Sequence, residues 1–175
     1  NSPWSNSALV VSVERGKDFS ADNVMAGLEF QRSIEKKAYN LSIKHASGKE
    51  MPAITVKEFL LGRINQRPLP KTSCPSKLFK ANFAEIFPSF IINHLKIALS
   101  DFDKKMKGFT FDDAVLIAPE SRTSAPITIL RDKETLESTS HKGLYPCGEG
   151  AGYAGGITSS AVDGIRVVEC IVKTL

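Results

Sequence analysis

The spacing of apolar residues predicts a mostly helical segment over residues 20–107. Apolar positions at helical intervals predict a long amphipathic helix at about 22–45, which begins after N-capping residues. Shorter apolar blocks predict helices at 56–61 and at about 82–105, the second interrupted at Pro88. Three prolines lie between Arg67 and Ser76, and they exclude a regular helix there. This stretch is therefore expected to be an extended surface connection.

Beyond Gly108 the pattern changes to short strands followed by one helix. Short apolar runs predict strands at 109–111, 114–118 and 127–130, with a further extended piece at 144–146. Another such run predicts a buried strand at 8–13. The last element is a helix at about 155–173, whose apolar stripe contains Ile157, Ala161, Ile165, Val168 and Val172. We therefore expect an α/β fold, which within this chain takes an α+β form.

Composition narrows the class of protein. The chain has 175 residues, of which 42% are hydrophobic and 24% charged, as in ordinary globular proteins. Its net charge is +4, and its lysine clusters have acidic neighbours, so we expect solvated helix faces and no nucleic-acid partner. No apolar run approaches the roughly 20 residues that span a bilayer. The first residue is Asn1, so we also expect the chain to begin inside a longer protein.

Cysteines and histidines give no sign of a metal site or a disulfide framework. The chain has 3 cysteines and 3 histidines, which are widely scattered and include no CxxC pair. This usage favours a reducing cytoplasm and no bound metal. Cys147 has no cysteine nearby in sequence, so we expect a packed, inert thiol.

A glycine-rich segment between a predicted strand and the last helix is the strongest candidate for chemistry. Its glycines are Gly148, Gly150, Gly152, Gly155 and Gly156. Glycine lets a ligand approach the backbone, and a helix N-terminus presents unpaired N–H groups, so together they suit an electron-rich group. Residues 150–155 match GxGxxG formally, but no second strand with an acidic end follows, as a dinucleotide fingerprint requires. The alternative is a tight packing corner without any ligand.

The segment resembles the C-terminal flavin segment of a bacterial family of FAD-dependent dehydrogenases. The pattern is G-L-Y-P-x-G-E-G-A-G-Y-A-G-G-I-x-S-x-A-x-D-G, from Gly143 to Gly164. The resemblance extends back through residues 120–127 and 6–11, so it covers most of the chain. The family that the segment resembles is that of the uncharacterised NAD(FAD)-utilising dehydrogenases. Their fold is similar to that of glutathione-reductase-type flavoproteins. It implies bound FAD and the C-terminal part of a Rossmann-like FAD-binding domain.

The resemblance also implies roles for individual residues. Glu149 would accept hydrogen bonds from the ribityl hydroxyls. The backbone N–H groups of Gly156 and Ile157 would face the N1/O2 edge of the flavin, where negative charge collects on reduction. Gly148 and Gly155 would let the backbone approach the cofactor.

The loop Arg122, Thr123 and Ser124 is the second candidate. The planar guanidinium of arginine suits phosphate, carboxylate or flavin carbonyl oxygens, and the two hydroxyls add donors. The resemblance places this loop beside the flavin. The alternative is an ordinary polar connection with a surface arginine.

These observations lead to one functional hypothesis. Residues 1–14 and 109–175 would belong to the FAD-binding domain, and residues 18–107 would form a helical insert that covers the active site. The whole protein would be an FAD-dependent oxidoreductase that transfers hydride or electrons to or from a small-molecule substrate, with NAD(P)H a candidate donor. The N-terminal half that holds the ADP end would lie outside this chain, so we expect the chain alone to be inactive.

Two other classes of function stay open at this stage. The first is a non-catalytic module that binds a nucleotide or anion at the glycine loop. The second is a structural or interaction domain in which the glycines serve packing alone. The sequence identifies no catalytic acid or base, because the flavin would carry the chemistry.

Overall fold

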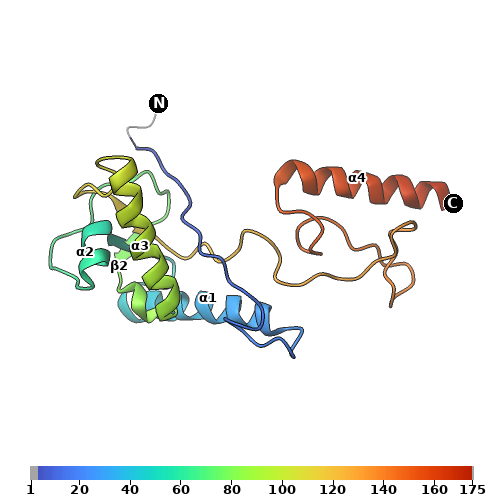
Figure 1. The fold of residues 1–175 in the computed structure, drawn as a ribbon, viewed down its shortest axis with the longest axis horizontal. Coiled ribbons are helices and arrows are strands. Elements are labelled where there is room, and N and C mark those ends of the chain that lie inside the picture. The colour runs from blue at the N-terminus through green and yellow to red at the C-terminus, as the bar shows by residue number, and fades with distance from the viewer. Residues whose placement is uncertain (1–3, 175) are drawn as a thin grey trace. The chain divides into compact units, whose positions relative to one another are not determined.

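The computed structural model describes residues 4–174 and shows an α+β protein (Figure 1). Its elements, in chain order, are α1 (Ala26–His45), β1 (Met51–Thr55), α2 (Val56–Leu61), β2 (Leu78–Lys80), a 3-10 turn η1 (Phe83–Glu85), α3 (Ser89–Lys105), β3 (Val115–Ile117) and α4 (Ile157–Thr174). The helices predicted at 22–45, 56–61, 82–105 and 155–173 are confirmed, with α1 beginning somewhat later than expected. The interruption predicted at Pro88 is also present, since Pro88 lies between η1 and α3.

The chain divides into two compact units. Unit 1 contains residues 1–14 and 32–119, and unit 2 contains residues 15–31 and 120–175. These bounds differ from the predicted flavin-binding ranges 1–14 and 109–175 and the predicted insert 18–107. Compactness does not report which residues contact a cofactor, so the functional division of the chain stays a prediction.

Unit 1 is built on a small three-stranded sheet in the order β2-β1-β3. β1 pairs in parallel with β2, in the register Met51 to Leu78, and antiparallel with β3, in the register Ile54 to Leu116. β3 confirms the strand predicted at 114–118. The pattern analysis did not identify β1 and β2, so residues 20–107 are less helical than expected.

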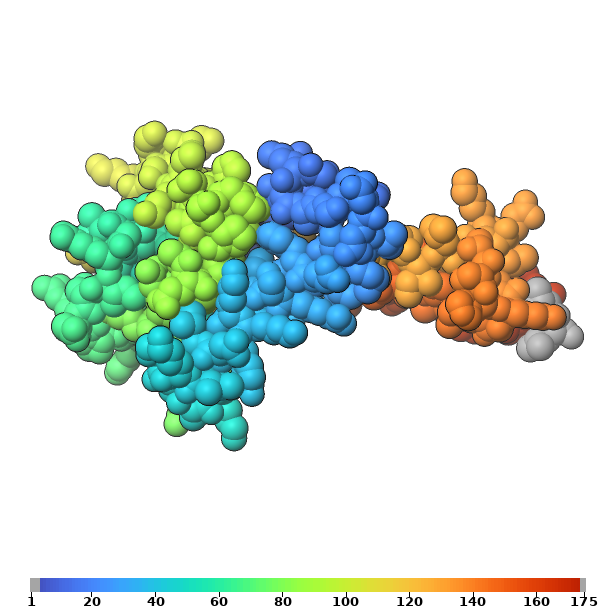
Figure 2. Space-filling model, turned by 90° about the horizontal axis from the view of Figure 1, so that it is seen from below, coloured from blue at the N-terminus to red at the C-terminus, as the bar shows by residue number. Residues whose placement is uncertain are grey.

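The hydrophobic core of unit 1 lies between this sheet and its helices. α1 contributes Ile34, Ala38 and Leu41, while α3 contributes Ile91 and Leu99, and all five are buried. Aromatic side chains of α2 and η1 extend the core, since the rings of Phe59 and Phe83 lie 6.0 Å apart in an edge-to-face arrangement. α1 (blue to cyan) and α3 (green to yellow-green) lie against each other on the face shown in Figure 2.

A buried ion pair fixes the start of α2. Thr55 caps the helix and Glu58 closes a capping box, with the Thr55 hydroxyl donating to the Glu58 carboxylate at 2.7 Å. Lys80 of β2 donates to the same carboxylate at 2.8 Å, and so does the Asn65 backbone N–H. Burial by itself would raise the pKa of Glu58, but these hydrogen bonds outweigh it and lower the pKa to about 2. The carboxylate is therefore held in its charged form.

Unit 2 has little regular structure besides α4. Residues 15–31 pack against the 120–126 loop, where a Cβ on Gly27 would approach the Cβ of Pro126 at 3.1 Å. Val167 and Asp163 of α4 are buried within this unit, as is Ala151 of the glycine segment. Further contacts of unit 2 join the glycine segment, the 127–131 segment and α4.

The strands predicted at 8–13, 109–111 and 127–130 are wrong, and the extended piece predicted at 144–146 forms no strand either. Strand formation requires a neighbouring backbone for hydrogen bonding, and no described strand pairs with these residues. A short apolar run therefore did not suffice to define a strand. Residues 127–131 instead make isolated contacts, such as Ile129 N–H to the Ala151 carbonyl at 3.1 Å.

Candidate functional site

The glycine segment folds into a compact loop before α4. The Gly152 N–H donates to the Glu149 carbonyl at 2.9 Å, and the Tyr153 N–H donates to the Gly148 carbonyl at 3.0 Å. Gly148 and Gly152 both have positive φ, which non-glycine residues rarely adopt. The loop is thus held by its own backbone hydrogen bonds.

The glycines differ in what surrounds them. A Cβ on Gly152 would lie 2.6 Å from the Ile127 carbonyl oxygen, so only glycine fits there. A Cβ on Gly155 would lie at an ordinary 3.5 Å from the Thr123 carbonyl, and Gly150 has open space around it. Neither of these two has a positive φ. Packing therefore explains Gly152, whereas the chain itself does not require glycine at 150 and 155.

Gly156 lies immediately before α4 and is engaged locally. Its N–H donates to the Ser159 hydroxyl at 3.1 Å, and that hydroxyl donates back to the Gly156 carbonyl at 3.0 Å. The first residue of α4, Ile157, is 94% exposed. A ligand at this helix end would have to displace the Ser159 hydroxyl to reach the Gly156 N–H.

The structure brings the two predicted sites together. Arg122 lies with its Nε 3.4 Å from the Glu149 carboxylate, in a half-exposed ion pair. The Thr123 carbonyl approaches Gly155, as noted above. Ser124 is exposed, and among residues 4–174 no hydrogen bond joins its hydroxyl to the glycine segment. Arg122, Thr123, Glu149 and Gly155 therefore form one continuous surface, which we call the Arg122–Glu149 site.

A second cluster, centred on Arg131 and Asp163, holds the backbone at the start of the glycine segment. The guanidinium of Arg131 makes two hydrogen bonds to the Asp163 carboxylate, at 3.0 and 2.7 Å, and a third to the Pro146 carbonyl at 2.7 Å. It also stacks on the ring of Tyr153 at 3.7 Å. Asp163 accepts the Gly148 N–H at 2.9 Å. The cluster thus fixes the backbone on both sides of Cys147.

Electrostatics in this cluster favours the charged pair. The hydrogen bonds from Arg131 lower the pKa of Asp163, and the same bonds raise the pKa of Arg131. Sequence reasoning did not identify Arg131 as part of the site. Asp163 stood in the quoted sequence pattern without a role, and its partner lies 32 residues away, too far for any local signal.

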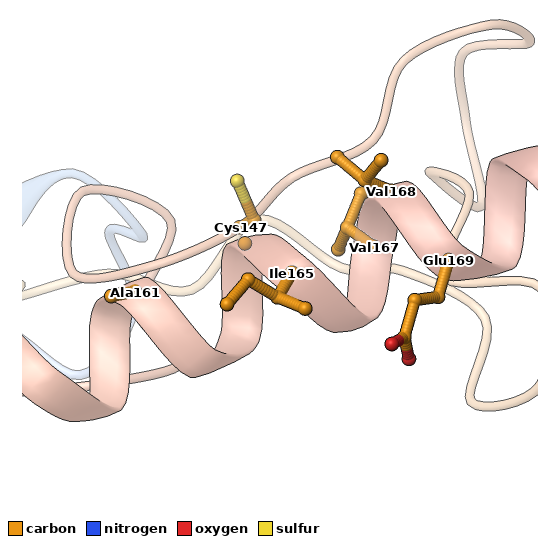
Figure 3. Close-up of a pocket in the computed structure, with 7 residues that line it drawn as sticks. Cys147, Ala161, Ile165, Val167, Val168 and Glu169 are labelled. Carbon is orange, nitrogen blue, oxygen red and sulfur yellow. The ribbon is translucent and has the colours of Figure 1, made fainter.

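A shallow groove of about 530 Å³ runs along α4 (Figure 3). Its walls include Cys147 from the loop before α4 and Ile165 and Val168 from α4 itself, all three of which are labelled in Figure 3. Cys147 is exposed, so the expectation of a packed thiol is wrong. The apolar stripe of α4 is exposed in the described structure, because α4 turns its Asp163 and Val167 face inward instead.

Neither a metal site nor a membrane span appears in the described residues. No group of three or more His, Cys, Asp or Glu side chains within 4–174 could hold a metal ion. Over the same residues, none of the helices has both the length and the apolar character needed to cross a bilayer.

Comparison with known proteins shows the family to which this chain belongs. Residues 1–123 match the family model described as "FAD-dependent protein, C-terminal domain-like". The chain belongs to this family. The match includes Arg122 and Thr123 but ends before the glycine segment.

One relative covers nearly all of the chain. A protein of Clostridium beijerinckii, described as uncharacterized, is 41% identical over 171 residues, which is 96% of this chain. The chain spans 31% of that relative's length. The family associates the chain with FAD-dependent proteins, and the relative's description adds no reaction.

Proposed function

We propose that the chain is the C-terminal part of an FAD-dependent oxidoreductase and that the Arg122–Glu149 site contacts the flavin. The family supports the cofactor. The main observation in favour of this site is that two sequence segments adjoin in unit 2. Arg122 pairs with Glu149, and the Thr123 carbonyl approaches Gly155. Such a surface combines a cation, an anion and an open backbone beside a helix N-terminus.

The unexplained glycines support a ligand at this surface. Packing within the chain accounts for Gly152, but Gly150 and Gly155 have room for a Cβ and no positive φ. A planar ligand lying against the backbone would explain why no side chain stands there. The alternative of a pure packing corner explains Gly152 alone.

The charges at the site suit the two ends of a flavin. Bound FAD would supply the hydride or electron transfer. The Arg122 guanidinium and the positive end of the α4 dipole would stabilise negative charge on the ring edge. Glu149 would accept hydrogen bonds from ribityl hydroxyls. Its carboxylate has acceptor sites left beside the long, half-exposed contact with Arg122, so the two interactions are compatible.

The remaining parts of the proposal concern the whole protein. We propose a Rossmann-like FAD-binding domain that includes residues 1–14 and 109–175, with residues 18–107 as an insert over the substrate. A segment outside this chain would bind the ADP end and cover the exposed stripe of α4, which contains Ile157, Ile165, Val168 and Val172. NAD(P)H is the proposed donor, and the three free cysteines agree with a cytoplasmic location.

The test uses the whole protein that contains this chain. Its visible absorbance after purification reports bound flavin, and we expect oxidised-flavin bands. Gly155→Ala should lower flavin content without changing the melting temperature, because its Cβ fits the chain but would meet the ligand. Glu149→Gln should weaken binding. Gly164→Ala is the control, because a Cβ there meets nothing within 4 Å and the residue lies outside the glycine segment.

Two outcomes would contradict the proposal at different levels. A folded, colourless whole protein that takes up no added FAD would overturn the oxidoreductase assignment. Normal flavin content in both Gly155→Ala and Glu149→Gln would leave the cofactor in place but remove it from the Arg122–Glu149 site.

A further inference from the structure

Unit 1 contains a strongly basic loop that the proposed function does not use. Residues 59–84 contain five basic residues and no acidic one; the five are Arg63, Arg67, Lys71, Lys77 and Lys80. Most of this stretch is the long connection between α2 and β2, which has no regular structure (Figure 1). The nearest acidic residues, Glu58 and Glu85, flank the stretch, and Glu58 pairs with Lys80.

Lys80 anchors this loop. Its ammonium group donates to the Glu58 carboxylate at 2.8 Å, to the Asn65 carbonyl at 3.3 Å and to the Arg67 carbonyl at 2.5 Å. Its side chain is only 17% exposed, so the loop is tied to the core of unit 1. Glu58 also accepts the Asn65 N–H. The backbone at 65–67 is therefore held in place, and the charge of Lys80 is neutralised.

The other four basic side chains have no counter-charge. None of the ion pairs formed within residues 4–174 involves Arg63, Arg67, Lys71 or Lys77. Arg67 stands on the anchored backbone and presents a guanidinium, whose planar donors match oxyanions. The loop therefore combines a fixed backbone with an unpaired cation.

A groove of about 910 Å³ opens at this point. Its lining combines polar and apolar residues; the polar ones are His45, Asn65, Gln66, Arg67 and Lys80, and the apolar ones include Ile64 and Leu69. The volume falls within the roughly 300–1,000 Å³ of small-molecule sites. Hydrogen-bond donors and aliphatic surface within one groove suit a molecule with an anionic end and an organic body.

We propose that this groove binds a small organic anion whose phosphate or carboxylate group is held by Arg67. The amide side chains of Asn65 and Gln66 supply further donors, and the organic part lies against Ile64 and Leu69. Lys80 also lines the groove, but its charge is already paired with Glu58, so its main role is to position the loop. The proposal concerns unit 1 and stands apart from flavin binding at the Arg122–Glu149 site.

The test is an NMR titration of the ¹⁵N-labelled chain at constant ionic strength. The probes are inorganic phosphate, adenosine monophosphate and citrate, so the series separates phosphate from carboxylate and the bare anion from one with an organic body. We expect saturable shifts of the Asn65, Gln66 and Arg67 amides with at least one organic probe. Arg67→Ala should weaken that binding about tenfold or more.

Arg63→Ala is the matched control, because it removes the same charge from the same loop but does not line the groove. It should change the affinity by less than about threefold, as expected for a screened charge outside the site. Equal losses in Arg63→Ala and Arg67→Ala would show a diffuse charge effect and overturn the proposal. Shifts that never saturate with any probe would overturn it as well.

Discussion

Replacement of Glu58 by glutamine should destabilise unit 1 strongly. The Glu58 side chain is 4% exposed and accepts hydrogen bonds from Lys80, Asn65 and Thr55. Glutamine has nearly the same shape but no charge, so Lys80 would be left as a largely buried cation without its partner. Breaking a buried pair in this way costs roughly 3–5 kcal/mol.

The pKa of Glu58 gives a second route to the magnitude. It falls from the ordinary 4.5 to about 2 because of the hydrogen bonds, despite burial. At about 1.4 kcal/mol per pKa unit, the folded state gains roughly 3 kcal/mol from the charged carboxylate. Because the folded pKa is lowered, this gain is present above about pH 4.5 and is lost as the pH falls towards 2. The two routes agree in size.

The assay is denaturant-dependent hydrogen exchange at the Ile54 and Leu99 amides, which lie in the core of unit 1. At neutral pH, Glu58→Gln should lower the free energy of opening by about 3 kcal/mol. The exposed Glu85→Gln serves as control and should change it by less than about 0.5 kcal/mol. Between about pH 4.5 and pH 2, the wild-type chain should lose about 3 kcal/mol more than Glu58→Gln.

The comparison over pH isolates Glu58. Other carboxyls of unit 1 with lowered pKa, such as Asp103 and Glu50, titrate equally in both proteins and cancel in the difference. If Glu58→Gln matched Glu85→Gln at neutral pH, the buried pair would contribute nothing. If the wild-type chain and Glu58→Gln then lost stability in parallel on acidification, the linkage argument would fail too.

Three further predictions concern unit 2. Gly152→Ala should destabilise the unit by about 1–3 kcal/mol through a clash with backbone and a positive φ, while Gly150→Ala should be nearly neutral; thermal melts followed by circular dichroism compare them. Asp163→Asn should cost roughly 3 kcal/mol by urea unfolding, because Arg131 loses its carboxylate. The folded pKa of Asp163 is lowered, so the difference from wild type should shrink below about pH 3.8, where the carboxyl of the unfolded chain takes up a proton first. A thiol-specific reagent should modify Cys147 first, because it is exposed while Cys74 and Cys170 are only partly so. Cys147→Ser should therefore remove the fastest phase of the reaction. An unchanged fast phase in this variant would contradict the exposure of Cys147.

The helices of this protein could be predicted from sequence, and most of its strands could not. Helical hydrogen bonds join residues four apart, so the spacing of Ile34, Ala38 and Leu41 already contains the information. A strand depends on a partner elsewhere in the chain. β1 contains Pro52, which lacks an N–H, and pairs with residues near 78 and 116, so its local sequence gives no warning of a central strand.

The candidate site shows the same division. The glycine segment and the Arg122 loop could be identified by composition and resemblance, and the structure brings Arg122 within 3.4 Å of Glu149. Arg131 could not be identified, because its role depends on contacts with Tyr153, 22 residues away, and with Asp163, 32 residues away. Distant pairs of this kind leave no periodic trace in the sequence.

The apolar stripe of α4 shows that apolar residues at helical spacing need not be buried within their own unit. The spacing of Ile157, Ile165, Val168 and Val172 places them on one stripe of α4, and these side chains are exposed while Val167 and Asp163 are buried. Apolar side chains at helical spacing record a requirement for burial but do not say which polypeptide meets it. Within the described residues the Arg131–Asp163 pair already determines how α4 faces its own unit. The stripe is therefore free to meet a surface outside unit 2.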